Sequence, residues 1–217
     1  MSAVIVRDRN LALINPALEG LRTDLGRGAG TYLTWKNIRA HADRVHIAQQ
    51  LGTWTWMRSI TVVACKRELT PGAMTVHQMY LYQFRFILER LSWLARQTGE
   101  VASYTLAHIK GFKLSMLRTY ESALQGQATQ IDWRHLDPAG GSLDQPQRNE
   151  NLQLADLLVS AQAPAFSLDR FGNTEIRYLT HTAPVIYRHG GNLTSYGLKI
   201  HPWNTNTKAA YPWVATL

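Results

Sequence analysis

The sequence has one cysteine, Cys65, and no internal repeat or low-complexity tract. A single cysteine excludes an internal disulfide and a cysteine-based metal cluster. No apolar run approaches the ~18–20 residues that a membrane-spanning helix needs. The few apolar residues before Arg7 are too short a stretch for the core of a signal peptide. We therefore expect a cytoplasmic protein that does not enter a membrane.

Carboxylates are also scarce in this chain. It has 15 Asp and Glu residues against 23 Lys and Arg residues, which gives a formal net charge of +8. This balance favours an anionic partner, and nucleic acid is the leading class of such partners. A basic surface can also serve solubility alone, so the charge by itself leaves both interpretations open.

The composition is otherwise that of an ordinary folded protein. Hydrophobic residues make up 45% of the 217 and charged residues 18%, which excludes a disordered, collagen-like or long coiled-coil chain. This length suits one domain with a core of its own. We predict a single domain over 1–217.

Hydrophobic periodicity predicts strands and helices that alternate along the chain. We expect strands at 3–6, 59–65, 100–107 and 129–133. We expect helices at 15–26, 35–51, 75–98, 110–124 and 151–161, with a loop at 137–151 and helical pieces on both sides of Pro184. This order predicts an α/β fold with helices on both faces of one sheet.

The strand at 59–65 is apolar on both faces, which is typical of a central strand. Lys66 and Arg67 follow its carboxyl end, where open α/β sheets bind their ligands. We predict that these two residues bind phosphate. Charged residues also end strands without any function, and this alternative stays open.

Two carboxylates are candidates for chemistry. Asp156 lies in an otherwise apolar helical turn, and burying a lone charge there costs several kcal/mol. Glu89 lies one residue away from the buried stripe of its helix. Each residue either borders a functional site or has a structural role, Asp156 as an exposed or Arg-paired position and Glu89 as a partner of Arg85 or Lys66.

Other kinds of site have less support in the sequence. His41 and His46 are five residues apart, which is the wrong spacing for two zinc ligands on one helix face. The chain also lacks the G-x-S-x-G motif that surrounds the nucleophilic serine of many hydrolases. Trp54 and Trp56, with Arg58 close by, are candidates for stacking on nucleic-acid bases.

Several segments together resemble the DUF3800 family, and the resemblance extends over about 30–202. The most specific segment is LQLADLL at 152–158. The others are the turn at Tyr32–Lys36, the strand end at Cys65-Lys66, the helix at Tyr80–Leu91 and the tail at Ser195–Pro202.

This resemblance implies a ribonuclease H-like mixed sheet with helices on both faces, in a family found in bacteria and their mobile elements. It implies a metal-dependent nuclease in which Asp156 binds Mg²⁺ or Mn²⁺, Glu89 assists or borders the site and Lys66 contacts phosphate. Such nucleases gather several carboxylates because one or two cannot hold two divalent ions.

The chain departs from the family pattern at its beginning. Family members open with a strand that carries Asp-Glu-Ser, and this chain has no Asp-Glu-Ser. Many members also have Asp where this chain has Cys65. Either the native start lies upstream of Met1 or catalysis has been lost. The alternative function is a non-catalytic nucleic-acid- or protein-binding module of a mobile-element or defence system.

Overall fold

The protein is built around a small mixed sheet, described here from a computed structural model that covers residues 1–69 and 74–217. The strand order is β1-β2-β5, with β1 at Ser2–Val6, β2 at Met57–Ala64 and β5 at Leu198–His201. Strand β1 runs antiparallel to β2, and β5 runs parallel to it. A separate parallel pair is formed by β3 (Thr105–Ala107) and β4 (Ser142–Asp144).

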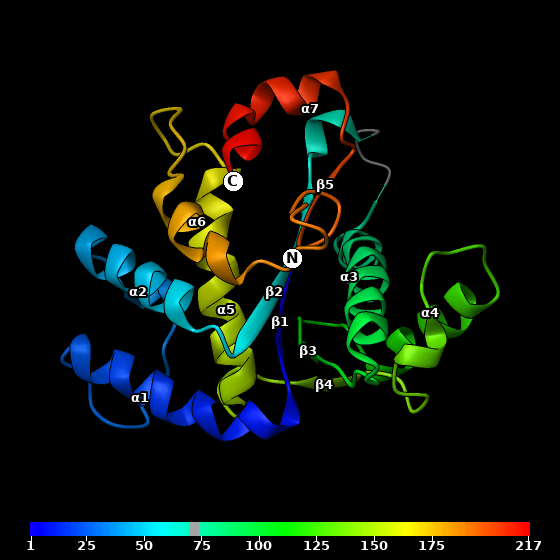
Figure 1. The fold of residues 1–217 in the computed structure, drawn as a ribbon, viewed down its shortest axis with the longest axis horizontal. Helices are drawn as coiled ribbons and strands as arrows, with labels where there is room; N and C mark the ends of the chain where they lie inside the picture. The colour runs from blue at the N-terminus through cyan, green and yellow to red at the C-terminus, as the bar shows by residue number, and fades with distance from the viewer. Residues whose placement is uncertain (70–73) are drawn as a thin grey trace.

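Helices surround this sheet. They are α1 (Ile14–Asp24), α2 (His41–Thr53), α3 (Val76–Thr98), α4 (Leu114–Gln125), α5 (Glu150–Gln162), α6 (Arg177–Thr182) and α7 (Thr205–Ala210). Figure 1 shows α3 on one side of β2 and α5 on the other. The predicted α/β fold with helices on both faces of a mixed sheet is confirmed.

Strand β2 is the central strand, as its apolar pattern predicted. Ile60 and Val62 pack into the core that α3 and α4 share. Ser59 and Thr61 are buried as well, and the Thr61 hydroxyl donates a hydrogen bond to Gln162 of α5. Alternate residues from Ser59 to Val62 therefore meet helices on opposite faces, which explains why this part of β2 is buried on both sides.

Helix α3 begins and ends where its sequence signals predicted. The Thr75 side chain accepts a hydrogen bond from the Gln78 backbone N–H, and the Gln78 side chain accepts one from the Thr75 backbone N–H. At the other end Gly99 adopts a left-handed conformation with φ 68°. A capping box and a glycine C-cap together define the 23 residues of this helix.

The predictions between α3 and α5 were partly wrong. The strand expected at 100–107 is reduced to the three residues of β3. The strand expected at 129–133 is absent, and Trp133–His135 form a 3-10 helix there. The loop expected at 137–151 contains β4, which pairs with β3 in parallel. Three-residue strands depend on a partner far along the chain, so local periodicity cannot reveal them.

Helix α2 also differs from its prediction. It begins at His41, because Trp35–Asn37 form a separate 3-10 helix. Gly52 does not end the helix but lies inside it, where a Cβ atom would collide with the backbone carbonyl of His181. This glycine allows α2 and α6 to pack backbone against backbone.

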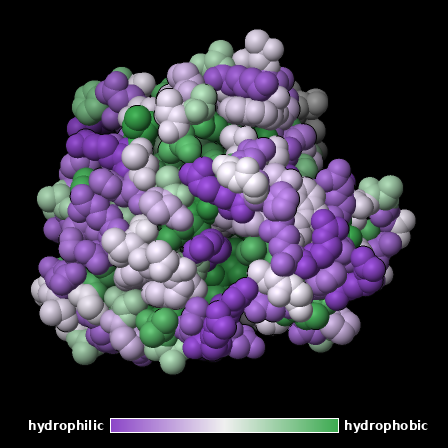
Figure 2. Space-filling model, in the orientation of Figure 1, coloured by the Kyte–Doolittle hydropathy of each residue, from purple (hydrophilic) through white to green (hydrophobic). Residues whose placement is uncertain are grey.

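Hydrophilic side chains cover much of the face seen in Figure 2, and hydrophobic residues show between them. No helix within residues 1–69 and 74–217 combines the length and the apolar character needed to cross a membrane.

Candidate functional site

Asp156 lies on α5, half-buried against the turn that leads into α2. Burial raises the pKa of its carboxyl group, while hydrogen bonding by the Thr34 side chain and the Trp35 backbone opposes that rise. Its negative charge in turn helps to raise the pKa of Tyr32. The groups around Asp156 are thus a hydroxyl, a backbone amide and a phenol.

The neighbouring residue Gln153 ties the same two segments together. Its side-chain oxygen accepts hydrogen bonds from the Leu33 backbone N–H and from Arg22 Nη2, both at 3.3 Å. Arg22 is only 1% exposed and also donates to the Thr31 carbonyl. Two of the segments that carry the DUF3800 resemblance, 32–36 and 152–158, therefore pack against each other.

Glu89 lies on α3 and is buried with two arginine partners. Arg90 Nη1 donates to Glu89 Oε2 at 3.0 Å, and Arg85 Nε donates to Glu89 Oε1 at 3.3 Å. Both Glu89 and Arg90 are at most 5% exposed. Both carboxylate oxygens of Glu89 are engaged, which gives this residue a structural role in holding Arg90 inside the protein.

The structure does not bring Glu89 and Asp156 together. Glu89 belongs to α3, whose apolar residues pack against one face of β2, and Asp156 belongs to α5 on the other face. Among residues 1–69 and 74–217, no three His, Cys, Asp or Glu side chains form a group that could hold a metal ion. The described side chains therefore do not fit the carboxylate cluster that a two-metal nuclease needs.

Lys66 and Arg67 lie where the sequence predicted, directly after the carboxyl end of β2. They are exposed and begin a one-turn 3-10 helix, Lys66–Glu68. The Glu68 carboxylate accepts hydrogen bonds from the side chains of Asn204 and Asn206. The acidic residue of this turn is thus engaged with the C-terminal segment, and its two basic residues remain exposed to solvent.

Strand β5 brings two further basic residues to the same end of the sheet. Ala64 of β2 pairs in register with His201 of β5, and the Cys65 backbone N–H donates to the His201 carbonyl at 2.9 Å. Lys199 precedes His201 by two residues and lies on the same face of the strand, because side chains alternate. We call Lys66, Arg67, Lys199 and His201 the basic edge.

Sequence reasoning missed Lys199 and His201. The tail showed too little periodicity for a strand to be predicted there, yet Leu198 and Ile200 are buried while Lys199 and His201 are only half-buried. This alternation over four residues was the available signal, and its pairing partner β2 lies more than 130 positions earlier in the chain.

The side of the basic edge that faces α3 has an excess of positive charge. Burial and the nearby Arg90 lower the pKa of Lys199, and Glu89 only partly opposes them. Burial, Lys199 and Arg90 lower the pKa of His201. Arg90 Nε has no hydrogen-bond partner among the described residues. Lys199 and Arg90 thus both lie near the carboxylate of Glu89, which already accepts hydrogen bonds from Arg85 and Arg90.

Aromatic rings interleave with these basic groups. The His201 ring stacks on Phe86 with 5.1 Å between ring centroids, and Tyr82 lies edge-on to both rings. Lys199 Nζ lies 5.7 Å from the centre of the Phe86 ring. Lys208 Nζ is placed similarly, 5.9 Å from the ring centre of Trp203. A lysine thus lies beside an aromatic ring at two places, Lys199 at Phe86 and Lys208 at Trp203.

The tryptophans singled out in the sequence lie at the other end of β2. Trp54 and Trp56 stack on each other, with centroids 5.6 Å apart and planes at 19°, and they pack against the core. Arg58 donates to the backbone carbonyls of Thr55 and Met57. Each ring of the pair already has the other as its stacking partner.

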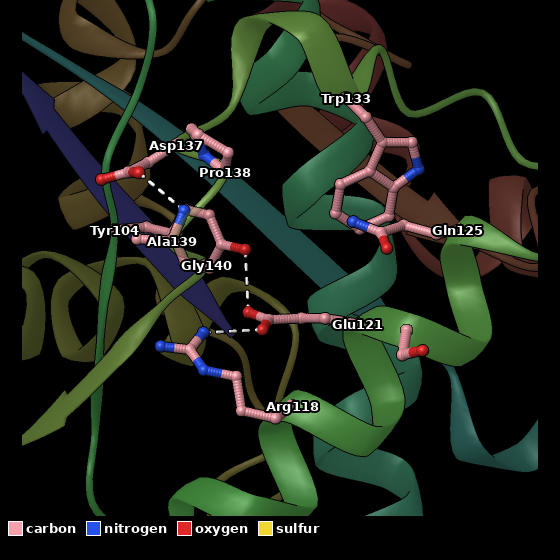
Figure 3. A pocket seen from close by; sticks show the side chains of 10 residues that line it. Tyr104, Arg118, Glu121, Gln125, Trp133, Asp137, Pro138, Ala139 and Gly140 are labelled. Carbon is pink, nitrogen blue, oxygen red and sulfur yellow. Dashed lines mark hydrogen bonds and ion pairs between the residues drawn. The ribbon is translucent and has the colours of Figure 1, made fainter.

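Figure 3 shows a pocket of about 260 Å³ between α4 and the loop at 137–140. At its base Glu121 accepts hydrogen bonds from Tyr104 Oη and Arg118 Nη1, both at 2.8 Å, and from the Gly141 backbone N–H at 2.9 Å. A side chain at Gly140 would collide with Arg118. These contacts fasten the loop onto α4 and use both oxygens of the buried carboxylate.

A second pocket, of about 540 Å³, lies beside the Asp156 turn and includes Trp35, Arg44 and Glu175 in its lining. The guanidinium of Arg44 lies over the Trp35 ring, and its Nε donates to the Ile38 carbonyl. Both oxygens of Glu175 accept hydrogen bonds from Arg177. The charged groups of this pocket are therefore engaged within the protein.

Comparisons of the chain with protein-family models, with curated proteins and with solved structures gave no match in any of the three.

Proposed function

We propose that this protein binds the phosphate backbone of nucleic acid at the basic edge. The observation that carries the proposal is Lys199, a half-buried lysine near Arg90. The carboxylate that acts on its pKa, Glu89, already accepts hydrogen bonds from two arginines. A phosphate oxygen at Lys199 would supply negative charge where positive charge has accumulated. Lys66 and Arg67 extend this surface into solvent.

The position of the basic edge supports the same function. It lies at the carboxyl end of the parallel pair β2 and β5, where α/β proteins place their ligand sites. The net charge of +8 would add a long-range attraction to any polyanion. Phosphate contacts of this kind are independent of base sequence.

The family resemblance stays part of this proposal. We propose a divergent DUF3800 member with a ribonuclease H-like fold, and two observations support this: 32–36 packs on 152–158, and α3 and α5 flank β2. A module of this kind in a mobile-element or defence system would bind nucleic acid without cutting it.

Metal-dependent cleavage at Asp156 is the second candidate. The observation in its favour is the half-buried carboxylate with a raised pKa, in the segment that most resembles the family. Among the described residues, Asp156 belongs to no group of three His, Cys, Asp or Glu side chains that could hold a metal ion. We therefore assign it no catalytic step.

The test is a binding and cleavage assay on one set of labelled 20-nucleotide DNA and RNA strands. We expect the full chain to bind them and the variants Lys66→Gln and Lys199→Gln to bind more weakly. Lys36→Gln, an exposed lysine next to the Asp156 turn, is the matched control. A greater loss in Lys36→Gln than in Lys199→Gln would place the interface at Asp156 instead.

Cleavage is measured in the same tubes with 5 to 10 mM Mg²⁺ or Mn²⁺, concentrations of roughly the size at which weakly bound divalent ions saturate. We expect intact strands with the wild type and with Asp156→Asn. Cleavage by the wild type that Asp156→Asn abolishes would establish the nuclease and contradict a purely binding role.

A further inference from the structure

We infer that the basic edge selects single-stranded nucleic acid over duplex, because Tyr82 and His201 surround the Phe86 ring that Lys199 contacts, and Trp203 lies beside Lys208. This inference rests on the proposed function and adds the class of strand that is bound. It follows from the order of aromatic and cationic groups at the carboxyl end of β2 and β5.

The first step is exposure. Tyr82, His201 and Trp203 are each only partly buried, and so is Phe86, the ring on which His201 stacks. Tyr82 Oη has no role in the hydrogen bonds of the described residues that hold the fold, and burial raises its pKa, so the hydroxyl is neutral near pH 7. These rings are held in place at an accessible surface.

The second step is spacing. The centroids of Tyr82 and His201 are 5.6 Å apart. Trp203, two residues after His201, packs against the cluster that contains Ile200 on the other face of β5. Lys199 lies next to the Phe86 ring and Lys208 next to the Trp203 ring. A bound strand can therefore place its bases next to aromatic rings at the same places where its phosphates lie next to lysines.

The third step is the chemistry of the strand. In a duplex the base faces are covered by their neighbours, and only the backbone and the groove edges are available. A single strand can turn its bases toward aromatic side chains while its phosphates contact Lys and Arg, and this stacking has little sequence preference. Single-stranded DNA or RNA therefore satisfies both kinds of group at this surface.

The experiment measures affinity for a 12-nucleotide strand and for the corresponding 12-base-pair duplex, with wild type, Tyr82→Leu and Trp203→Leu. We expect each variant to lose roughly tenfold in affinity for the single strand and to bind the duplex as the wild type does. Trp56→Leu, in the stacked pair at the far end of β2, is the aromatic control and is expected to bind like the wild type.

Because Trp203 packs against a buried cluster, each variant is first checked for its circular dichroism and its unfolding midpoint. A strand carrying 2-aminopurine gives a second measurement, since stacking quenches its fluorescence and simple phosphate contact does not. We expect quenching by the wild type and its loss in Tyr82→Leu, a variant at a partly exposed position.

The outcomes separate the two proposals. Equal affinity for strand and duplex, with no loss in Tyr82→Leu or Trp203→Leu, would overturn the inference and leave phosphate binding intact. A loss in Trp56→Leu alone would also overturn it by moving the stacking to the tryptophan pair. No binding of either nucleic acid would mean that the proposed function itself is wrong.

Discussion

The imidazole of His201 stacks on the ring of Phe86, with 5.1 Å between the centroids and 29° between the planes. This contact joins the last residue of β5 to the middle of α3. It places a titratable ring next to Lys199 and Arg90, which both lower its pKa. The electrostatics of the basic edge therefore depend on how β5 sits against α3.

This arrangement predicts that the fold loses stability when the solution is acidified. Burial, Lys199 and Arg90 lower the pKa of His201 below its ordinary value of 6.5. The unfolded chain takes up this proton near pH 6.5, while the folded chain resists it. The contribution of neutral His201 to the free energy of unfolding is complete above pH 6.5. It is lost as the pH falls through the pKa that His201 has in the folded protein.

Urea denaturation at several pH values measures this effect. We expect His201→Gln to lose less stability than the wild type between pH 7 and pH 5. Identical losses in the two proteins would show that His201 does not couple folding to pH.

Nucleic-acid binding is expected to have the opposite pH dependence. A phosphate beside His201 stabilises the charged imidazolium and raises its pKa, so binding is accompanied by proton uptake. The affinity for a single strand should increase as the pH falls from about 7.5 to about 5.5, the range in which a histidine titrates. Fluorescence anisotropy over this range measures it, and the increase should be smaller in His201→Gln. An affinity that does not change with pH would place the strand away from His201.

Glu89 is predicted to matter for stability. Replacing it with Gln leaves Arg90 buried at 3% exposure without its charged partner. We expect a loss of about 3 kcal/mol in the free energy of unfolding, as for other buried pairs that lose one member. The double variant Glu89→Gln with Arg90→Met should recover part of this loss, because it removes the unpaired charge. Full stability of the single variant would contradict the structural role.

The contact between α2 and α6 gives an independent prediction for the fold. Gly52→Ala should destabilise the protein by about 2 kcal/mol or more, because its methyl group meets the His181 carbonyl. Gly20→Ala is the matched control. Gly20 lies in α1, and a Cβ there meets nothing within 4 Å. We expect it to stabilise the protein by about 0.5–1 kcal/mol. Thermal unfolding of both variants tests the backbone packing of α2 on α6. Equal changes in stability in the two variants would contradict this packing.

Local signals in the sequence were enough for the long elements. The apolar stripe of α3 and the apolar run of β2 predicted the bounds of both elements to within two residues. The short strands β4 and β5 were not predicted and the strand expected at 100–107 is longer than β3, since each of these strands depends on a partner far along the chain. The position of Gly52 inside α2 could not be predicted either, because the residue that it packs against, His181, belongs to α6.

The candidate site could likewise be predicted from local sequence signals only in part. Lys66 and Arg67 could be predicted because they directly follow a clear strand. Lys199 and His201 belong to a four-residue strand, and their relation to Arg90 exists only once β5 has packed against α3. The family resemblance implied that Asp156 and Glu89 belong to one site, and their separation by the sheet is a property of the tertiary fold.

The salt dependence of single-strand binding tests the central proposal most directly. For wild type, the logarithm of the association constant should fall linearly with the logarithm of salt concentration. The double variant Lys66→Gln with Lys199→Gln should reduce the slope by about 1.4, which is ~0.7 for each lost phosphate contact. Lys36→Gln with Lys113→Gln removes two exposed lysines outside the basic edge and should leave the slope unchanged. An unchanged slope in the first double variant, or an equal reduction in the second, would contradict phosphate binding at the basic edge.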